Sequence, residues 1–99
     1  MALPPRCPTC GAATRPNVVW FGETLPEAAL TAAAEAFMRA DVALVIGTSG
    51  LVEPAASLGR LALQNGATVL EINPEPTPLS RDASLYLPLD AAEGLNALL

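Results

Sequence analysis

At 99 residues with 52% hydrophobic side chains, the chain has the size of one domain or part of one, and it is too apolar for a disordered acidic tail. Ten acidic residues against five arginines give a net charge of −5, and the lack of a basic stripe excludes nucleic-acid binding. The chain has no histidine and no lysine, so alone it cannot supply a histidine base, a Schiff-base lysine or a histidine-ligated metal.

The first sixteen residues contain four prolines and show no hydrophobic periodicity. We therefore expect residues 1–16 to form a knuckle or an ordered loop. Residues 17–21, with the sequence NVVWF, are β-branched and aromatic and predict a short strand. Alternation along that strand would turn one of Trp20 and Phe21 toward the sheet and the other toward a cleft.

The next segment predicts an amphipathic helix that ends at Arg39. Thr24 and Glu27 have the spacing of a capping box, and Pro26 suits a first helical turn. Apolar side chains then repeat at three- and four-residue spacing along one face, namely Leu30, Ala34, Phe37 and Met38.

Two further strands enclose a second helix. Residues 41–47 are apolar at both alternating sets of positions, which predicts a strand covered on both faces. Residues 53–65 predict a helix, and Gly66 stands where a left-handed C-cap belongs. Residues 67–73 predict the next strand, which ends at a proline-rich segment.

A weaker strand at residues 84–87 and a short helix over residues 91–99 complete the chain. Strands that alternate with helices of this length predict right-handed crossovers and a parallel sheet. The expected fold class is therefore α/β, with a parallel sheet between two helical layers.

Cys7 and Cys10 are the only cysteines, and they are followed by Gly11. Two cysteines at this spacing can face one tetrahedral ion, so they could form half of a zinc site. Two incidental thiols are the plain alternative. A redox pair is the third reading, although such a pair belongs at a helix N-terminus after a strand, and this one precedes the first strand.

Two loops at strand ends could hold a nucleotide. Residues 47–50, with the sequence GTSG, connect a predicted buried strand to a helix, where small residues let a ligand approach the backbone. Ordinary strand-to-helix turns use the same residue types. Asn73 and Glu75 end the next strand, where an acidic group can hold ribose hydroxyls, although an Asn-Pro turn also explains Asn73.

Three segments resemble the sirtuin family of NAD-dependent protein deacylases. CPTCGAATRPNVVWFGETLP at residues 7–26 is similar to the family's second zinc cysteine pair and the RPxVVWFGE segment that follows it. GTSGLVEPA at residues 47–55 resembles the GTSxxVxPA loop, and EINPE at residues 71–75 resembles the family's EINPE segment. The three occur in the family's order with similar gaps, and together they span nearly the whole chain.

The resemblance implies roles for individual positions. Cys7 and Cys10 match half of a structural four-cysteine zinc site. The acyl-lysine site is matched by Val19, Phe21, Gly22, Glu23 and Val52, and on this ground we assign Phe21 to the cleft. The NAD site is matched by Gly47, Thr48, Ser49, Asn73, Pro74, Glu75 and Ala91. The family usually has a glycine near the last of these positions. Residues 1–16 would be half of a zinc-ribbon knuckle, and residues 17–99 the C-terminal part of a Rossmann-like, doubly wound NAD-binding domain.

The family's Gly-rich pyrophosphate loop, catalytic histidine and first cysteine pair lie upstream of the matched region. The resemblance therefore implies the C-terminal part of an NAD-dependent protein lysine deacylase, with part of the NAD and acyl-lysine sites and without the histidine base. Alone, such a chain is expected to be inactive. The alternative is a non-catalytic nucleotide- or partner-binding module derived from a sirtuin.

Location and partners follow from composition and from the resemblance. The first residues lack the apolar stretch of a signal peptide, and the longest large-apolar run, residues 42–46, is far below the ~20 residues of a membrane-spanning helix. We expect a cytoplasmic protein without membrane contact. The expected partners are an acyl-lysine peptide, once the site is complete, and a second copy of the chain, because the strand at 41–47 would lack a neighbour.

Overall fold

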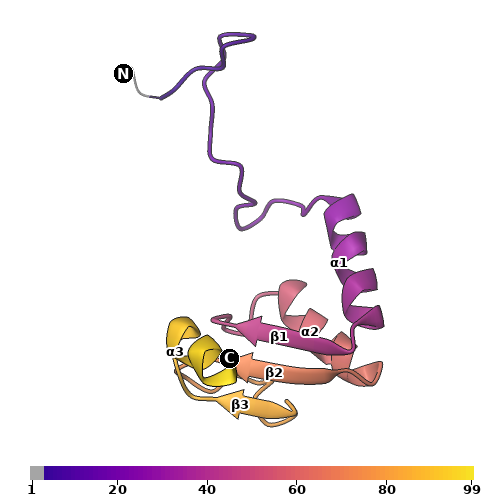
Figure 1. The fold of residues 1–99 in the computed structure, drawn as a ribbon. Helices are drawn as coiled ribbons and strands as arrows, with labels where there is room; N and C mark the ends of the chain where they lie inside the picture. Colours follow the sequence, from indigo (N-terminus) through magenta and orange to yellow (C-terminus); the bar gives the residue numbers. More distant parts are fainter. Residues whose placement is uncertain (1–3) are drawn as a thin grey trace.

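The structure is a computed structural model that describes residues 4–99, so the first three residues of the expected knuckle lie outside it. The chain measures 50 × 29 × 25 Å, with a radius of gyration of 17.3 Å. A compact domain of about 100 residues has a radius near 13 Å. The excess comes from the N-terminal segment, which leads away from an α/β body (Figure 1).

The body is built on a three-stranded parallel sheet in the order β1-β2-β3. The strands are β1 (Val42–Ile46), β2 (Thr68–Ile72) and β3 (Leu85–Leu87), close to the three ranges expected from the later part of the sequence. Val45 pairs with Glu71, and Ile46 with Ile72. The α/β class with a parallel sheet is confirmed.

Helices α2 (Ala55–Gln64) and α3 (Ala91–Leu98) cover opposite faces of the sheet (Figure 1). A Cβ on Gly59 of α2 would lie 3.3 Å from Val45, whereas one on Gly94 of α3 would lie 2.3 Å from Ile72. Because adjacent pairs in the register point to opposite faces, Val45 and Ile72 mark the two sides of the sheet. Small residues let both helices approach the strands closely.

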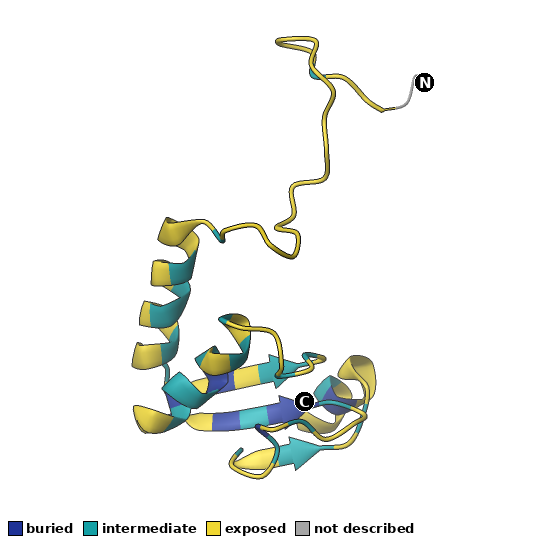
Figure 2. Ribbon diagram, turned by 180° about the vertical axis from the view of Figure 1, so that it is seen from behind, coloured by how far each residue is buried: buried dark blue, intermediate teal, exposed yellow. Residues whose placement is uncertain are grey.

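Helix α1 (Glu27–Arg39) packs along α2 and has no fully buried residue (Figure 2). Its range agrees with the expected helix, but the predicted capping box is wrong. Pro26 takes the N-cap position and no side chain caps the helix. Glu27 therefore remains as an acidic residue in the first turn, where it complements the helix dipole. Just after the C-terminal end of α2, Gly66 has a φ of +87°, the left-handed conformation that the predicted C-cap requires.

The expected strand at 17–21 does not form in the described chain. The segment pairs with no strand, and its residues are exposed. Trp20 is 52% and Phe21 93% exposed, so neither lies against a sheet. The NVVWF pattern has β-propensity, but propensity without a neighbouring strand produces no ladder.

Strand β1 is an edge strand, and only one of its faces is covered. Val42 and Leu44 on the face opposite α2 are 57% and 46% exposed, which corrects the expectation of a strand buried on both faces. The core lies on the α2 side, between β1, β2 and α2, and includes Ala43, Ala62, Val69 and Leu79 (Figure 2). Within the described residues no helix is both long and apolar enough to span a membrane.

Candidate functional site

The loops after β1 and β2 start at the same edge of the sheet, because parallel strands end together. Gly47 N–H donates to the carbonyl of Ile72 at 3.0 Å, and Asn73 N–H donates to that of Leu87 at 3.1 Å. Gly47 and Gly50 have φ values of +70° and +68°, a region that side chains other than glycine rarely enter. A Cβ on Gly47 would meet no atom within 4 Å, so the start of the 47–50 loop has open space beside it.

Asn73 joins the two loops. Its Nδ2 donates to the Thr48 carbonyl oxygen at 2.8 Å, and its Oδ1 accepts from Glu75 N–H at 3.2 Å. Tyr86 Oη donates to the Asn73 carbonyl at 2.9 Å. Burial, together with nearby Glu71 and Glu75, raises the pKa of the Tyr86 hydroxyl and so keeps it a donor. Asn73 thus ties the loop after β2 to the backbone of the loop after β1.

The hydroxyls of the first loop shape its backbone. Thr48 Oγ1 accepts from Gly50 N–H at 3.3 Å, and Ser49 Oγ accepts from Leu51 N–H at 3.2 Å. Ser49 is exposed and Thr48 half-buried, while Pro74 and Glu75 are exposed at the start of the other loop. Both loops thus present polar groups to solvent at one edge of the sheet.

Glu71 is a buried carboxylate that was not among the predicted site residues. Its side chain is 1% exposed, and its two oxygens accept from the hydroxyls of Thr77 and Ser80. Thr77 Oγ1 in turn accepts from Leu79 N–H at 3.2 Å. A Cβ on Gly50 would lie 3.4 Å from that of Thr77, so the loop held by Glu71 rests against the first loop. The only sequence signal is an acid within an otherwise apolar strand.

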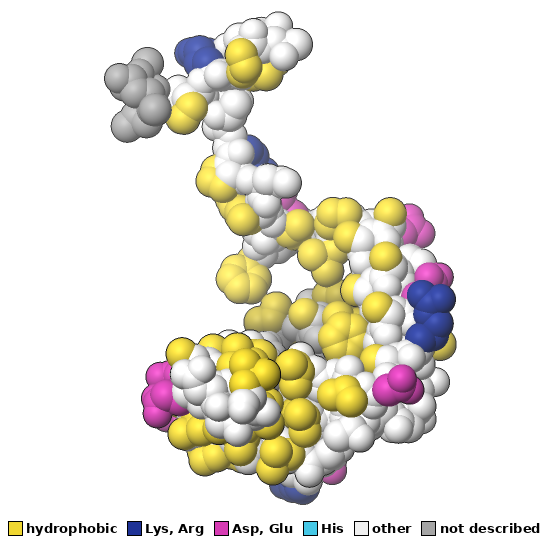
Figure 3. Space-filling model, viewed as in Figure 1, with side chains coloured by type: hydrophobic (Ala, Val, Ile, Leu, Met, Phe, Trp, Pro, Cys, Tyr) yellow, Lys and Arg dark blue, Asp and Glu magenta, His cyan; other side chains and the backbone are white. Residues whose placement is uncertain are grey.

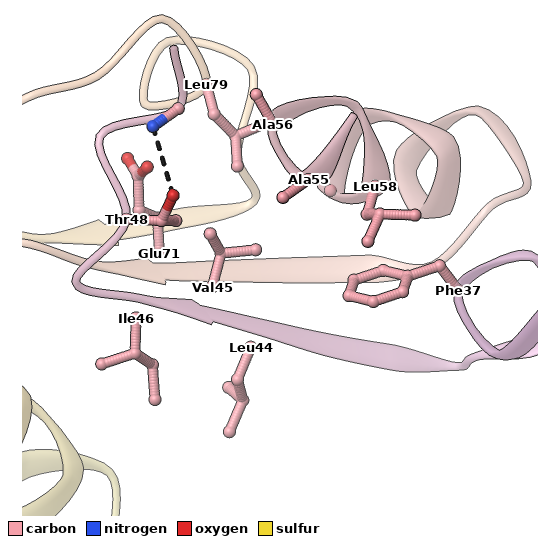
Figure 4. Close-up of a pocket in the computed structure, with 12 residues that line it drawn as sticks. Phe37, Leu44, Val45, Ile46, Thr48, Ala55, Ala56, Leu58, Glu71 and Leu79 are labelled. Carbon is pink, nitrogen blue, oxygen red and sulfur yellow. Dashed lines mark hydrogen bonds between the residues drawn. The ribbon is translucent and has the colours of Figure 1, made fainter. Parts of the chain in front are cut away.

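An apolar cavity of about 210 Å³ lies beneath the first loop, between β1 and α2. Val45 and Leu79 point to the α2 side of the sheet, whereas Leu44 and Ile46 point to the other side (Figure 4). Thr48 and Glu71 are the polar residues at the loop end of this cavity. The cavity continues the core toward the open edge of β1.

A second hollow, which we call the apolar groove, has a volume of about 200 Å³. Its lining comes from two segments, residues 19–25 and residues 52–55, and includes every residue predicted for the acyl-lysine site: Val19, Phe21, Gly22, Glu23 and Val52. Apolar side chains gather around the hollow between the N-terminal segment and the body (Figure 3). Trp20 lines the groove beside Phe21, so the predicted division of the two rings between sheet and cleft is wrong.

Cys7 and Cys10 lie in a tight hairpin at the N-terminal end of the described chain. Gly11 N–H donates to the Cys7 carbonyl and Cys7 N–H to that of Ala12, both at 2.8 Å. Backbone N–H groups of Cys10 and Thr9 lower the pKa of the Cys7 thiol, which favours the metal-binding thiolate. This shape fits two ligands of a zinc ion, and no group of three or more metal-ligating side chains occurs among residues 4–99.

Ala91 is the first residue of α3 and is exposed. Asp90 caps this helix by accepting from Glu93 N–H at 2.8 Å, and that bond lowers the pKa of Asp90. The side chain of Ala91 offers no hydrogen-bonding group, so only its backbone could form a hydrogen bond with a cofactor.

The arrangement of two joined loops beside an apolar groove corresponds to a known family. The sequence model of the Sir2 family matches residues 1–54, more than half of the chain. The chain belongs to the Sir2 family. It is 59% identical over 98 residues to an NAD-dependent protein deacylase of Thermus thermophilus and 57% identical over 91 residues to NAD-dependent protein deacylase 1 of Caldanaerobacter subterraneus.

Those alignments cover 99% and 92% of this chain but 39% and 38% of the two relatives, so the chain spans well under half of their length. Solved Sir2 structures agree. A Sir2 homologue in complex with NAD is 47% identical with a TM-score of 0.85, and Sir2Tm bound to a propionylated peptide is 35% identical with a TM-score of 0.83. Each covers 95% of this chain, which matches 37% and 40% of those chains. The sirtuin resemblance and the Rossmann-like class are thereby confirmed.

Proposed function

We propose that this chain supplies the C-terminal part of an NAD-dependent protein deacylase. In this proposal the 47–50 and 73–75 loops contact NAD, and the apolar groove receives the acyl-lysine side chain. The observation that carries it is the Asn73–Thr48 hydrogen bond of 2.8 Å, which sets two polar loops at one edge of the sheet. Ligands of open α/β sheets bind at the carboxyl ends of strands.

The two sites have complementary chemistry. NAD supplies an activated ribose carbon, whose bond to nicotinamide breaks as the acyl oxygen attacks. Thr48 and Ser49 offer hydroxyls and backbone groups to the polar cofactor, while Phe21 and Val52 offer apolar surface to an acyl chain. Relatives named NAD-dependent protein deacylases and a structure with a propionylated peptide support this assignment.

Nucleotide binding is tested by titrating the chain with ADP-ribose and with NAD in a calorimeter. Asn73→Ala removes two hydrogen bonds that hold the loops, so we expect about tenfold weaker ADP-ribose binding. Asn65→Ala is the matched control, because Asn65 bonds only within the end of α2, to Leu61. Tight binding that survives both Asn73→Ala and Ser49→Ala would remove these loops from the site.

We also propose that Cys7 and Cys10 are two of four ligands of a structural zinc ion. A complete site is worth about 10–16 kcal/mol, and two thiolates supply only half of the ligands. We expect this chain to lose zinc readily to a chelator, unless two copies share one ion, and Cys7→Ser to abolish the remaining binding. Metal analysis that finds one tightly held zinc per chain would contradict this prediction.

Location and self-association are further parts of the proposal. We propose a cytoplasmic location, where both thiols would stay reduced and available to a metal ion. The open edge of β1, with Val42 and Leu44 exposed beside it, supports self-association when no other strand covers it. Size-exclusion chromatography over a range of concentrations measures this association.

A further inference from the structure

Residues 15–23 have no helix or strand, yet one side chain ties the segment together. Arg15 Nη2 and Nη1 donate to the two carboxylate oxygens of Glu23 at 2.8 and 3.2 Å. Arg15 Nη2 also donates to the carbonyl of Val18 at 3.2 Å. A forked guanidinium that binds a carboxylate through both nitrogens fixes its orientation as well as its distance.

Trp20 closes the same cluster. The Arg15 guanidinium lies 3.9 Å from the centre of the Trp20 ring, and Trp20 N–H donates to Glu23 Oε1 at 2.9 Å. Glu23 N–H donates back to the Trp20 carbonyl at 3.0 Å. We call this set of contacts among Arg15, Trp20 and Glu23 the Arg15 clamp. These contacts give a defined shape to a segment whose residues are exposed and do not pack in the hydrophobic core.

Two residues of the clamp, Trp20 and Glu23, line one wall of the apolar groove, whereas Arg15 does not. Val19 and Phe21 lie between the clamped residues in the sequence and take part in none of its side-chain contacts, so their side chains stay available to the groove. The facing wall, residues 52–55, precedes and begins helix α2. The width of the groove therefore depends on how firmly residues 15–23 keep their shape.

We propose that Arg15 is a positioning residue, which holds the Val19–Phe21 wall of the apolar groove in place by clamping Glu23 and Trp20. This inference rests on the proposed function in so far as the groove receives an acyl-lysine side chain. Arg15 itself does not line the groove, so it acts through the residues that it holds.

The charges around the clamp make it sensitive to pH in a defined direction. The Arg15 guanidinium and the Trp20 N–H lower the pKa of Glu23. Across the groove stands Glu53, whose carboxylate accepts from the Ser57 hydroxyl. The clamp is thus complete above the ordinary glutamate value of 4.5 and is lost as the pH falls through the lowered pKa of Glu23.

Trp20 is the only tryptophan in the chain, so its fluorescence reports on the clamp directly. We expect Arg15→Gln to raise the acrylamide quenching constant of Trp20 by up to about twofold, because the ring is already 52% exposed and an exposed ion pair contributes little. Arg15→Lys keeps the positive charge but lacks the forked guanidinium, so its quenching constant should lie between those of the wild type and Arg15→Gln. In the wild-type chain the constant should rise below pH 4.5, whereas in Glu23→Gln it should not change with pH.

Arg60→Gln is the matched control, because it removes an equally exposed pair, Arg60–Asp82 at 2.7 Å, far along the sequence from the groove. It should leave Trp20 quenching unchanged. Quenching in Arg15→Gln equal to that of the wild type would overturn the proposal.

A fluorescently labelled acetyl-lysine peptide gives the second readout, by anisotropy. We expect Arg15→Gln to weaken its binding by a factor of about two to five, with recovery in part by Arg15→Lys. Unchanged affinity across these variants would overturn the positioning role. If no chain binds the peptide, the groove needs the rest of the protein to bind it, and the quenching result alone decides the clamp: a rise supports it and no change overturns it.

Discussion

Mixed with NAD and an acetyl-lysine peptide, the 99-residue chain is expected to yield no deacetylated peptide above background. The chain has no histidine, and a general base of that kind contributes about 10²–10⁴-fold to a reaction rate. No carboxylate near the groove replaces it. Arg15 holds the pKa of Glu23 low, which makes it a weak base, and the Glu53 carboxylate accepts the Ser57 hydroxyl. Glu71, in the neighbouring cavity, is buried with both oxygens accepting hydroxyls. Mass spectrometry of the peptide and nicotinamide release measure the outcome.

Activity should appear when the missing region is supplied. The complement is the part of the Thermus thermophilus deacylase that this chain does not match, because the 59% identity of the matched part should preserve the contacts between the two. The control is the same complement with its catalytic histidine replaced by alanine. Mixed with this chain, it should give no deacylase activity. Turnover by the chain alone would contradict the prediction. Failure of the mixture would favour a non-catalytic binding module.

The body of the fold could be predicted because its elements have strong local signals. The strands at 42–46 and 68–72 are mostly apolar and β-branched, and the helix between them has a regular apolar stripe. Gly66 marked the end of α2 because a left-handed residue was needed there. These features depend on residues close together in the sequence, so no knowledge of distant contacts was required.

The N-terminal part could not be predicted in the same way, because its shape depends on side chains that meet across a loop. NVVWF has the composition of a strand, but without a neighbouring strand the Arg15 clamp determines its conformation. Likewise Thr24 had the right spacing for a capping box, yet Pro26 took the N-cap position. The composition of a segment indicates which structures it can form, and the residues that contact it in the folded chain determine which one it adopts.

In the candidate site, too, some features could be predicted from local sequence and others depend on contacts between distant residues. The loops that contain Thr48 and Asn73 were both predicted to follow strands, and parallel strands end at one edge of the sheet, which brings the two residues within hydrogen-bond distance. Glu71 was not foreseen, since nothing in the sequence says that a carboxylate within a buried strand will find two hydroxyls six and nine residues later. Its importance is visible only from burial and partners.

Glu71→Leu is expected to lower the free energy of unfolding even though it replaces a buried charge with an apolar side chain of similar length. Removing the carboxylate leaves the Thr77 and Ser80 hydroxyls without their acceptor in a part-buried place, at a cost of about 1–3 kcal/mol each. For a domain of this size each kcal/mol lowers the melting temperature by about 4–8 °C. Circular dichroism during thermal unfolding measures the change, and Glu75→Leu, at an exposed position of the same loop, is the control.

The decisive comparison adds Thr77→Val and Ser80→Ala to Glu71→Leu. If the loss arises from unpaired hydroxyls, removing them together with the acid should recover only part of the stability, because Thr77 Oγ1 also accepts from Leu79 N–H and Ser80 Oγ from Thr77 N–H, and these two donors lose their acceptors. ADP-ribose affinity should not recover, since the loop after β2 would no longer be tied to the sheet by Glu71 and its contact with Gly50 would loosen. A triple variant less stable than Glu71→Leu would show instead that the two hydroxyls stabilise the loop mainly through these backbone N–H groups and not through Glu71.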